Sequence, residues 1–186
     1  RKIPRKYDNP IDNVLIDISE WLNPYFKKMN FTPNMITTIS LLFGLISNYT
    51  YYKNYYYIAA ILFMISYFFD CMDGNYARKY DMQTKFGDVY DHIKDWTIFL
   101  IFIVLFLNKK ISTNFKIICF IIIVLTSIGT SIYLGCTEDY MCKYNKRANK
   151  SETIALVSWC PDIKYINYTK YFSTGTLNIL VAFIII

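Results

Sequence analysis

Acidic residues crowd one short part of this sequence. Six of its 14 Asp and Glu residues lie between residues 70 and 95, namely Asp70, Asp73, Asp81, Asp88, Asp91 and Asp95. All but Asp81 lie in or beside long apolar runs. A carboxylate inside a membrane span costs about 2.5–3.5 kcal/mol, so four unpaired ones would cost on the order of 10 kcal/mol. Something must therefore neutralise these side chains.

The spacing of the acids predicts that they share helix faces. Asp70 and Asp73 are three residues apart. Asp91 and Asp95 are four apart, so each pair lies on one face of a helix. Because a short turn separates the two helices, we expect antiparallel neighbours whose acidic faces converge. Close carboxylates repel one another unless some are protonated or a cation neutralises them. Mg²⁺ prefers carboxylates plus substrate phosphate, and a pair of such ions can clamp both oxygens in phosphoryl transfer.

Small residues and one arginine lie among the acids. Gly74 and Ala77 belong to the first acidic helix and Gly87 to the second, where they leave space for a nucleotide or diphosphate against bare backbone. The planar guanidinium of Arg78 can hold a pair of diphosphate oxygens. The simpler alternatives are helix packing by small residues for the glycines and a membrane-interface anchor for Arg78.

Apolar segments of helical length must position these residues. Four long runs cover residues 33–52, 55–78, 88–108 and 114–136, and a fifth runs from Phe172 to the end of the sequence. A helix needs about 20 residues to cross a bilayer, so we expect the fifth run to be a truncated or partial span, or the start of one. The predicted fold is an all-α polytopic membrane bundle of five or six transmembrane helices.

The N-terminal residues predict a helix of a different kind. Residues 11–29 carry apolar side chains at three- and four-residue spacing, with polar side chains opposite them. This pattern indicates an amphipathic helix that lies on the membrane surface. We therefore expect residues 1–30 to form a cytoplasmic segment with this interfacial helix, and residues 31–186 to form a transmembrane catalytic domain.

Composition and charge support a membrane protein. Hydrophobic residues make up 54% of the chain and charged residues 18%, against about 45–50% and 25% in soluble domains. This excludes a disordered chain, a collagen-like fibre and a disulfide-stapled mini-protein, and it argues against a water-soluble enzyme. The net charge is +6. Its Lys and Arg residues lie between apolar runs rather than in a basic stripe, so we expect no nucleic acid partner.

The basic residues also predict an orientation. With a cytoplasmic N-terminus, most Lys and Arg fall in inside segments, as the positive-inside rule requires, and Lys94 lies within the third run. We expect an integral, multi-pass membrane protein whose acidic site faces the cytoplasm. The five Cys residues include no C-x-x-C pair, which argues against a zinc site and a disulfide framework. Cys71 and Cys119 lie in apolar runs and are expected to be packing residues.

The acids and small residues together form one ordered pattern, Asp70-x-x-Asp73-Gly74-x-x-Ala77-Arg78, eight residues, then Gly87-x-x-x-Asp91-x-x-x-Asp95. This pattern resembles the signature of the CDP-alcohol phosphotransferase family at all eight positions. The N-terminal amphipathic helix and the flanking apolar runs resemble the layout of the family too. Family members usually have six spans, whereas at most five can be counted here.

The resemblance implies a transferase of phospholipid biosynthesis and lipid metabolism. Such enzymes move a phosphatidyl or phospho-alcohol group from a CDP-linked donor, such as CDP-diacylglycerol, to an alcohol acceptor and release CMP. They use Mg²⁺ or Mn²⁺, and two ions are expected here. Family members are often homodimers, and membrane lipids are their other expected partners.

The resemblance also assigns roles to residues of this sequence. Asp70, Asp73 and Asp91 would hold the metals, and Asp95 would complete the cluster and act as the usual candidate base. The pocket for CDP would be lined by Gly74, Ala77, Arg78 and Gly87, with Asn34 and Thr37 bordering the nucleotide.

Several alternatives stay open at this point. His92 is a second candidate for the catalytic base, because the stretch from Gly87 to His92 is similar to the choline/ethanolamine branch of the family. The compact chain is more similar to users of CDP-diacylglycerol. Inositol users often carry Arg after the last Asp, where this sequence has Trp96. A non-enzymatic divalent-cation carrier and an inactive family member are the alternatives from another functional class.

Overall fold

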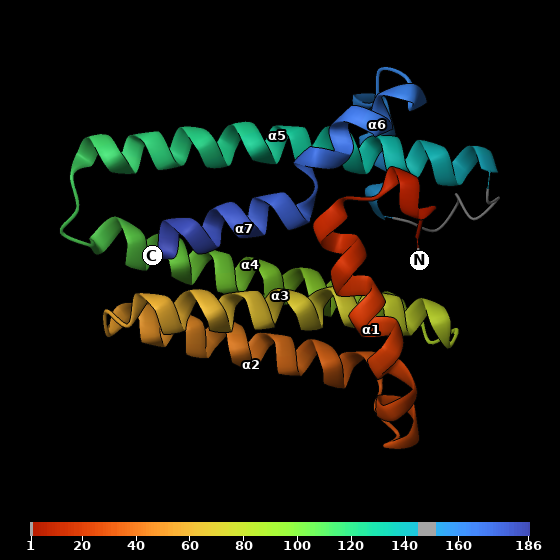
Figure 1. Cartoon of the computed structure of the whole chain (residues 1–186), viewed down its shortest axis with the longest axis horizontal. Coiled ribbons are helices and arrows are strands. Elements are labelled where there is room, and N and C mark those ends of the chain that lie inside the picture. Colours follow the sequence, from red (N-terminus) through yellow and green to blue (C-terminus); the bar gives the residue numbers. More distant parts are fainter. Residues whose placement is uncertain (1, 145–151) are drawn as a thin grey trace. The chain divides into compact units, whose positions relative to one another are not determined.

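The structure is a computed structural model that describes residues 2–144 and 152–186. These residues form helices and turns and contain no strand, so the all-α prediction is confirmed (Figure 1). The α-helices are α1 (Pro10–Lys28), α2 (Pro33–Tyr52), α3 (Tyr56–Lys79), α4 (Lys85–Asn108), α5 (Thr113–Tyr144), α6 (Ile166–Thr169) and α7 (Thr174–Ile185). Short 3₁₀ helices cover Arg5–Tyr7, Glu152–Trp159, Ile163–Tyr165 and Lys170–Phe172.

The helices differ in their ability to cross a membrane. Within the described residues, α3 and α5 are long and apolar enough to do so. The consecutive helices α1 and α2, which are bent by 117° relative to each other, count as a third span if taken together. This is fewer than the five or six spans expected. The first half of α4 carries several charges, and α7 has only 12 residues.

The chain divides into two compact units. The first comprises Arg1–Asn13 and Ile117–Leu180, and the second comprises Val14–Lys116 and Val181–Ile186. The acidic motif lies wholly in the second unit, so the elements that position it are those of that unit. The division expected from the sequence, into a cytoplasmic segment of residues 1–30 and a transmembrane domain of residues 31–186, stays a prediction.

Helix α2 is the centre of the second unit, because it packs against both α3 and α4. The middle of its inner face is small and polar, with Ser40, Gly44, Ser47 and Asn48 buried between the larger buried residues Ile36 and Tyr51. The hydroxyl of Ser40 donates to the carbonyl of Ser66 on α3 at 2.8 Å, and the hydroxyl of Ser66 donates to the carbonyl of Ser40 at 2.8 Å. Small residues and interhelical hydrogen bonds of this kind let membrane helices approach closely.

The helix ends beside the motif are fixed by capping residues. Thr32 caps α2 by accepting a hydrogen bond from the backbone N–H of Met35 at 3.3 Å, and Pro33 occupies the first turn, where its missing N–H costs nothing. Thr84 caps α4 by accepting from the backbone N–H of Gly87 at 3.0 Å. The turn between α3 and α4 contains Asp81 in the left-handed region, at φ 53°.

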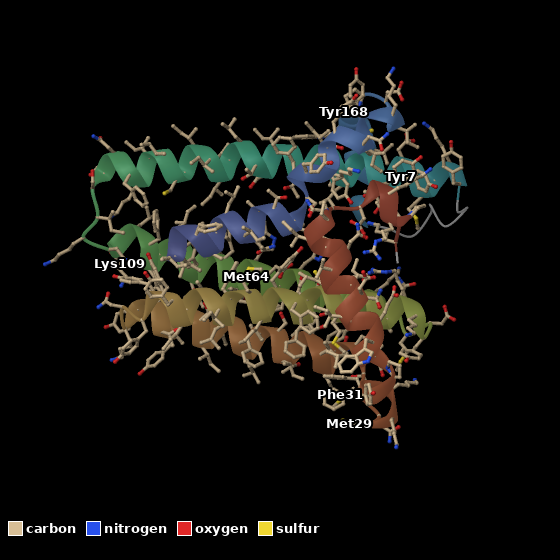
Figure 2. The ribbon with its side chains drawn as sticks, viewed as in Figure 1. Tyr7, Met29, Phe31, Met64, Lys109 and Tyr168 are labelled. Carbon is tan, nitrogen blue, oxygen red and sulfur yellow. A yellow bond between two sulfur atoms is a disulfide. The ribbon has the colours of Figure 1, made fainter. Side chains whose placement is uncertain are left out.

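Helix α1 contacts α3 through polar groups near the motif. The amide of Asn23 donates to the side-chain oxygen of Asn75 at 2.7 Å, and both residues are buried. The hydroxyl of Tyr76 donates at 2.8 Å to the carbonyl of Phe31, which lies with Met29 at the turn between α1 and α2 (Figure 2). The opposite face of α1 is apolar and exposed at Val14, Ile18, Trp21 and Tyr25, as the amphipathic pattern predicts.

The first unit is held together by buried polar contacts and a disulfide. The hydroxyl of Tyr133 on α5 donates to Asp8 at 3.0 Å, and the hydroxyl of Ser173 donates to Asp12 at 2.7 Å. Cys136 and Cys160 form a disulfide. The prediction of no disulfide framework is therefore wrong, because the pairing joins residues 24 positions apart that no short Cys motif relates.

Candidate functional site

Three of the motif carboxylates converge between α3 and α4. Asp70 on α3 and Asp91 and Asp95 on α4 each offer one oxygen, and these three oxygens all lie within 4.8 Å of one another. We call this group the Asp triad. Asp91 and Asp95 reach the same place because they are one helical turn apart. The acidic faces of the two helices thus meet as the spacing predicts, and α2 supports both helices from one side.

A lysine that the sequence analysis left without a role lies at the centre of the Asp triad. The Lys94 ammonium forms ion pairs with Asp91 and Asp95, each at 2.9 Å, and a third ion pair with Asp70. Only 1% of Lys94 is exposed. Its position three residues after Asp91 puts it on the same helix face, so helical periodicity alone could have placed it in the cluster.

Asp73 stands apart from the Asp triad and contacts α2 instead. Its Oδ2 accepts a hydrogen bond of 2.6 Å from the hydroxyl of Thr37, and both side chains are buried. The structure therefore brings three of the four predicted metal ligands into one group and leaves the fourth beside it. Asp73 faces a neighbouring pocket rather than Lys94.

This pocket is formed by α2, α3, the α3–α4 turn and the start of α4. It is lined by Pro33, Asn34, Thr37, Asp73, Gly74, Ala77, Arg78, Met82, Gln83, Thr84, Gly87, Asp88 and Asp91. All six residues predicted to border the nucleotide are in this lining. Its empty volume is about 430 Å³ when the part open to solvent is included. Asp91 belongs to both the pocket and the Asp triad, so the two are directly adjacent.

The glycines of the motif leave space that neighbouring polar groups occupy. A Cβ atom on Gly74 would lie 3.2 Å from a terminal nitrogen of Arg78, so the guanidinium lies over bare backbone. A Cβ atom on Gly87 would lie 3.1 Å from both the side-chain oxygen of Asn34 and the hydroxyl of Thr84. Both glycines therefore admit polar side chains of the pocket, beyond any role in helix packing.

The two candidate bases differ in position. Asp95 belongs to the Asp triad, although 57% of its side chain is exposed. His92 lies on α4 with an exposed side chain and is absent from the pocket lining. One step along a helix turns a side chain by about 100°, which explains why Asp91 lines the pocket and His92 does not.

Sequence reasoning missed several residues of the pocket. Met82, Gln83 and Thr84 come from the turn, and Asp88 comes from the first turn of α4. A signal existed for Thr84, because a threonine just before an amphipathic run is typical of a helix N-cap. No comparable sequence signal marks Met82 or Gln83, since the path of a turn depends on the helices that it joins.

The donor set of the Asp triad fits a hard divalent cation, because such ions bind carboxylate oxygens. The Oδ1 atom of Asp91 is buried and accepts no hydrogen bond of good geometry, although the Lys94 ammonium lies 2.9 Å away. An oxygen of this kind could serve as a metal ligand if the ammonium moved away from it.

Comparison with curated proteins gives one informative relative. The chain is 33% identical over 94 residues to an archaetidylinositol phosphate synthase of Pyrococcus horikoshii. The aligned region covers 50% of this chain and 46% of that protein, so the chain matches about half of the relative's length. No solved structure matches the chain.

The comparison with family models agrees with the motif. The model of the CDP-alcohol phosphatidyltransferase family matches residues 30–185, which include the whole motif, α2, α3 and α4. The described residues include helices that are long and apolar enough to cross a bilayer. Together with the match to a family of membrane enzymes, these helices identify an integral membrane protein. The chain belongs to the CDP-alcohol phosphatidyltransferase family.

Proposed function

We propose that this protein is a membrane transferase that moves a phosphatidyl or phospho-alcohol group from a CDP-linked donor to an alcohol and releases CMP. The observation that carries the proposal is the position of Asp91, which lies in both the Asp triad and the pocket. A diphosphate in the pocket would therefore lie beside the carboxylate oxygens that would hold a metal ion.

We assign different contacts with the CDP-linked donor to different residues of the pocket. Arg78 would hold diphosphate oxygens with its guanidinium, which lies over Gly74. Gly87 leaves the amide of Asn34 free to lie beside the nucleotide. Thr37 would orient Asp73 through its hydrogen bond of 2.6 Å.

The Asp triad and Asp73 would hold Mg²⁺ or Mn²⁺, and such ions neutralise the charge that develops on the phosphates as CMP leaves. Asp95 would take the proton of the acceptor hydroxyl, because it belongs to the Asp triad beside the pocket, whereas His92 belongs to neither the triad nor the pocket lining. A general base must come within hydrogen-bond reach of the proton that it removes.

The donor and acceptor remain proposals of chemical class. CDP-diacylglycerol is the proposed donor, and the name of the relative makes an inositol phosphate one acceptor to test. A CDP-choline or CDP-ethanolamine donor with diacylglycerol as acceptor is the alternative. We also propose that the site faces the cytoplasm, because most Lys and Arg residues then lie in inside segments. We further propose that the protein acts as a homodimer, as members of the family often do.

The decisive experiment measures CMP release by purified protein in detergent with Mg²⁺. Radiolabelled CDP-diacylglycerol is offered with a panel of alcohols that includes inositol phosphate, and CDP-choline is offered with diacylglycerol. We expect CMP in one arm, and we expect Asp91→Asn to abolish it. Asp81→Asn is the matched control, because Asp81 lies in the turn outside the Asp triad and Asn tolerates its positive φ.

Two outcomes would contradict the proposal. One is CMP release by Asp91→Asn at the rate of the unaltered protein. The other is cation flux through liposomes that contain the protein when no nucleotide is present and no CMP forms with any donor. The second result would favour the carrier alternative.

A further inference from the structure

The Lys94 ammonium occupies the place that a metal ion would take in the Asp triad. The ammonium forms one ion pair with each of Asp70, Asp91 and Asp95. These are the three residues whose carboxylate oxygens lie within 4.8 Å of one another. A cation bound by those oxygens and the ammonium cannot share this position. With Lys94 in place, three ionised carboxylates and one ammonium leave a charge of two negative units, which still attracts a divalent ion.

The burial of Lys94 makes this arrangement more than a surface ion pair. The side chain is 1% exposed, whereas those of Asp70, Asp91 and Asp95 are exposed to 25%, 32% and 57%. The ammonium therefore lies on the inner side of the carboxylates, and the carboxylates separate it from solvent. A buried charge is strongly stabilised only while it is paired, so Lys94 and the Asp triad hold each other in position.

We propose that Lys94 is a built-in counter-cation that holds the Asp triad together and that a divalent ion must displace from it. This inference rests on the proposed function, because it assigns a role to Lys94 at the same site. Lys94 then acts as a positioning residue. It preforms the carboxylate group and, by competing for the oxygens, sets the concentration of metal at which the site is loaded.

Mn²⁺ binding to the purified full chain, followed by the electron paramagnetic resonance signal of free Mn²⁺, tests the competition directly. Lys94→Met removes the ammonium and keeps a side chain as long as the aliphatic part of lysine. We expect the dissociation constant for Mn²⁺ to fall by about tenfold or more, within the range by which neighbours of metal ligands alter affinity. Lys85→Met is the matched control, because it removes the same charge from an exposed position at the start of α4. An unchanged or weaker Mn²⁺ affinity in Lys94→Met would overturn the proposal.

A second measurement avoids any loss of folding in the variant. In the unaltered protein, an amine-reactive acylating reagent should modify Lys94 slowly, since the side chain is buried. If Mn²⁺ displaces the ammonium, acylation of Lys94 should rise with Mn²⁺ concentration while that of Lys85 stays constant, as mass spectrometry of peptides would show. Acylation of Lys94 that Mn²⁺ leaves unchanged or lowers would contradict displacement.

The two proposals fail in different ways. CMP release with normal Mn²⁺ affinity in Lys94→Met would refute the role of Lys94 and leave the transferase function standing. Tighter Mn²⁺ binding in Lys94→Met, with no CMP release by the unaltered protein, would refute the function and leave the competition standing.

Discussion

The hydroxyl of Thr37 on α2 lies 2.6 Å from Oδ2 of Asp73 on α3, and both side chains are buried. Through this contact α2 orients the motif carboxylate that stands outside the Asp triad. The helix that carries none of the motif acids therefore shapes the site twice, by supporting α3 and α4 and by holding Asp73. The Thr37 hydroxyl also lies 3.1 Å from the Pro33 carbonyl oxygen, and both residues line the same pocket.

Thr37→Val tests this contact because valine keeps the shape of threonine and removes the hydroxyl. We expect CMP release to fall by about tenfold or more, as for other residues that orient metal ligands. Thr37→Ser should retain most of the activity, since it keeps the hydroxyl. Thr38→Val is the control, because the neighbouring Thr38 is exposed and its hydroxyl contacts Asn34 and Tyr90 instead. Equal losses in Thr37→Val and Thr38→Val would refute a specific role of the hydroxyl.

The motif spacing was sufficient to predict which helix faces carry the acids, since i,i+3 and i,i+4 relations follow from helix geometry alone. It was not sufficient to predict how the four carboxylates divide. That division depends on Thr37, which comes from another helix, α2, and bonds Asp73. It also depends on Lys94, which the sequence analysis noted only as a charged residue within the third apolar run. The spacing of residues along the sequence shows which side chains share a face of one helix. It does not show which side chains of two different helices come into contact, because that depends on how the helices pack.

Gly87→Ala tests whether the glycine serves the pocket rather than helix packing. The new methyl group would lie 3.1 Å from the Asn34 oxygen and the Thr84 hydroxyl, so these polar groups must shift. We expect KM for the CDP-linked donor to rise by about tenfold, since misplaced binding groups raise KM. The melting temperature should change little, because alanine favours helix over glycine. A large drop in melting temperature with unchanged KM would assign Gly87 to packing instead.

Trp21 tests the interfacial position of α1. Its side chain is 66% exposed on the apolar face that also carries Val14, Ile18 and Tyr25. In a variant whose other two tryptophans are replaced, Trp96→Phe with Trp159→Phe, we expect lipids brominated near the headgroup to quench Trp21 fluorescence. Lipids brominated near the end of the acyl chain should quench it less, since amphipathic helices bury their apolar face about 5–10 Å deep. Quenching by neither lipid would remove α1 from the membrane surface.

The number of spans and the cysteine pairing mark the limits of prediction from composition. Apolar runs identified the positions of α2, α3 and α4, and the start of α5, to within a few residues, because a run of helical length in lipid must satisfy its backbone groups internally. The run predicted to end at residue 136 instead continues as α5 to Tyr144, since the polar residues after Gly135 remain helical. Cys136 pairs with Cys160 for a reason that appears only in three dimensions, where both residues meet beside Gly135.

The disulfide between Cys136 and Cys160 gives the last prediction, because it closes a loop of 24 residues on the first unit. Loop-closure entropy for this length corresponds to about 3 kcal/mol of stability. Cys160→Ser should therefore lower the melting temperature in detergent without reductant, and reductant should lower that of the unaltered protein to a similar value. Cys142→Ser is the control, since Cys142 is a free cysteine of the same helix as Cys136. In denatured protein, a maleimide should label three of the five cysteines before reduction and all five after it. Labelling of all five without reductant would show that the pair is not formed.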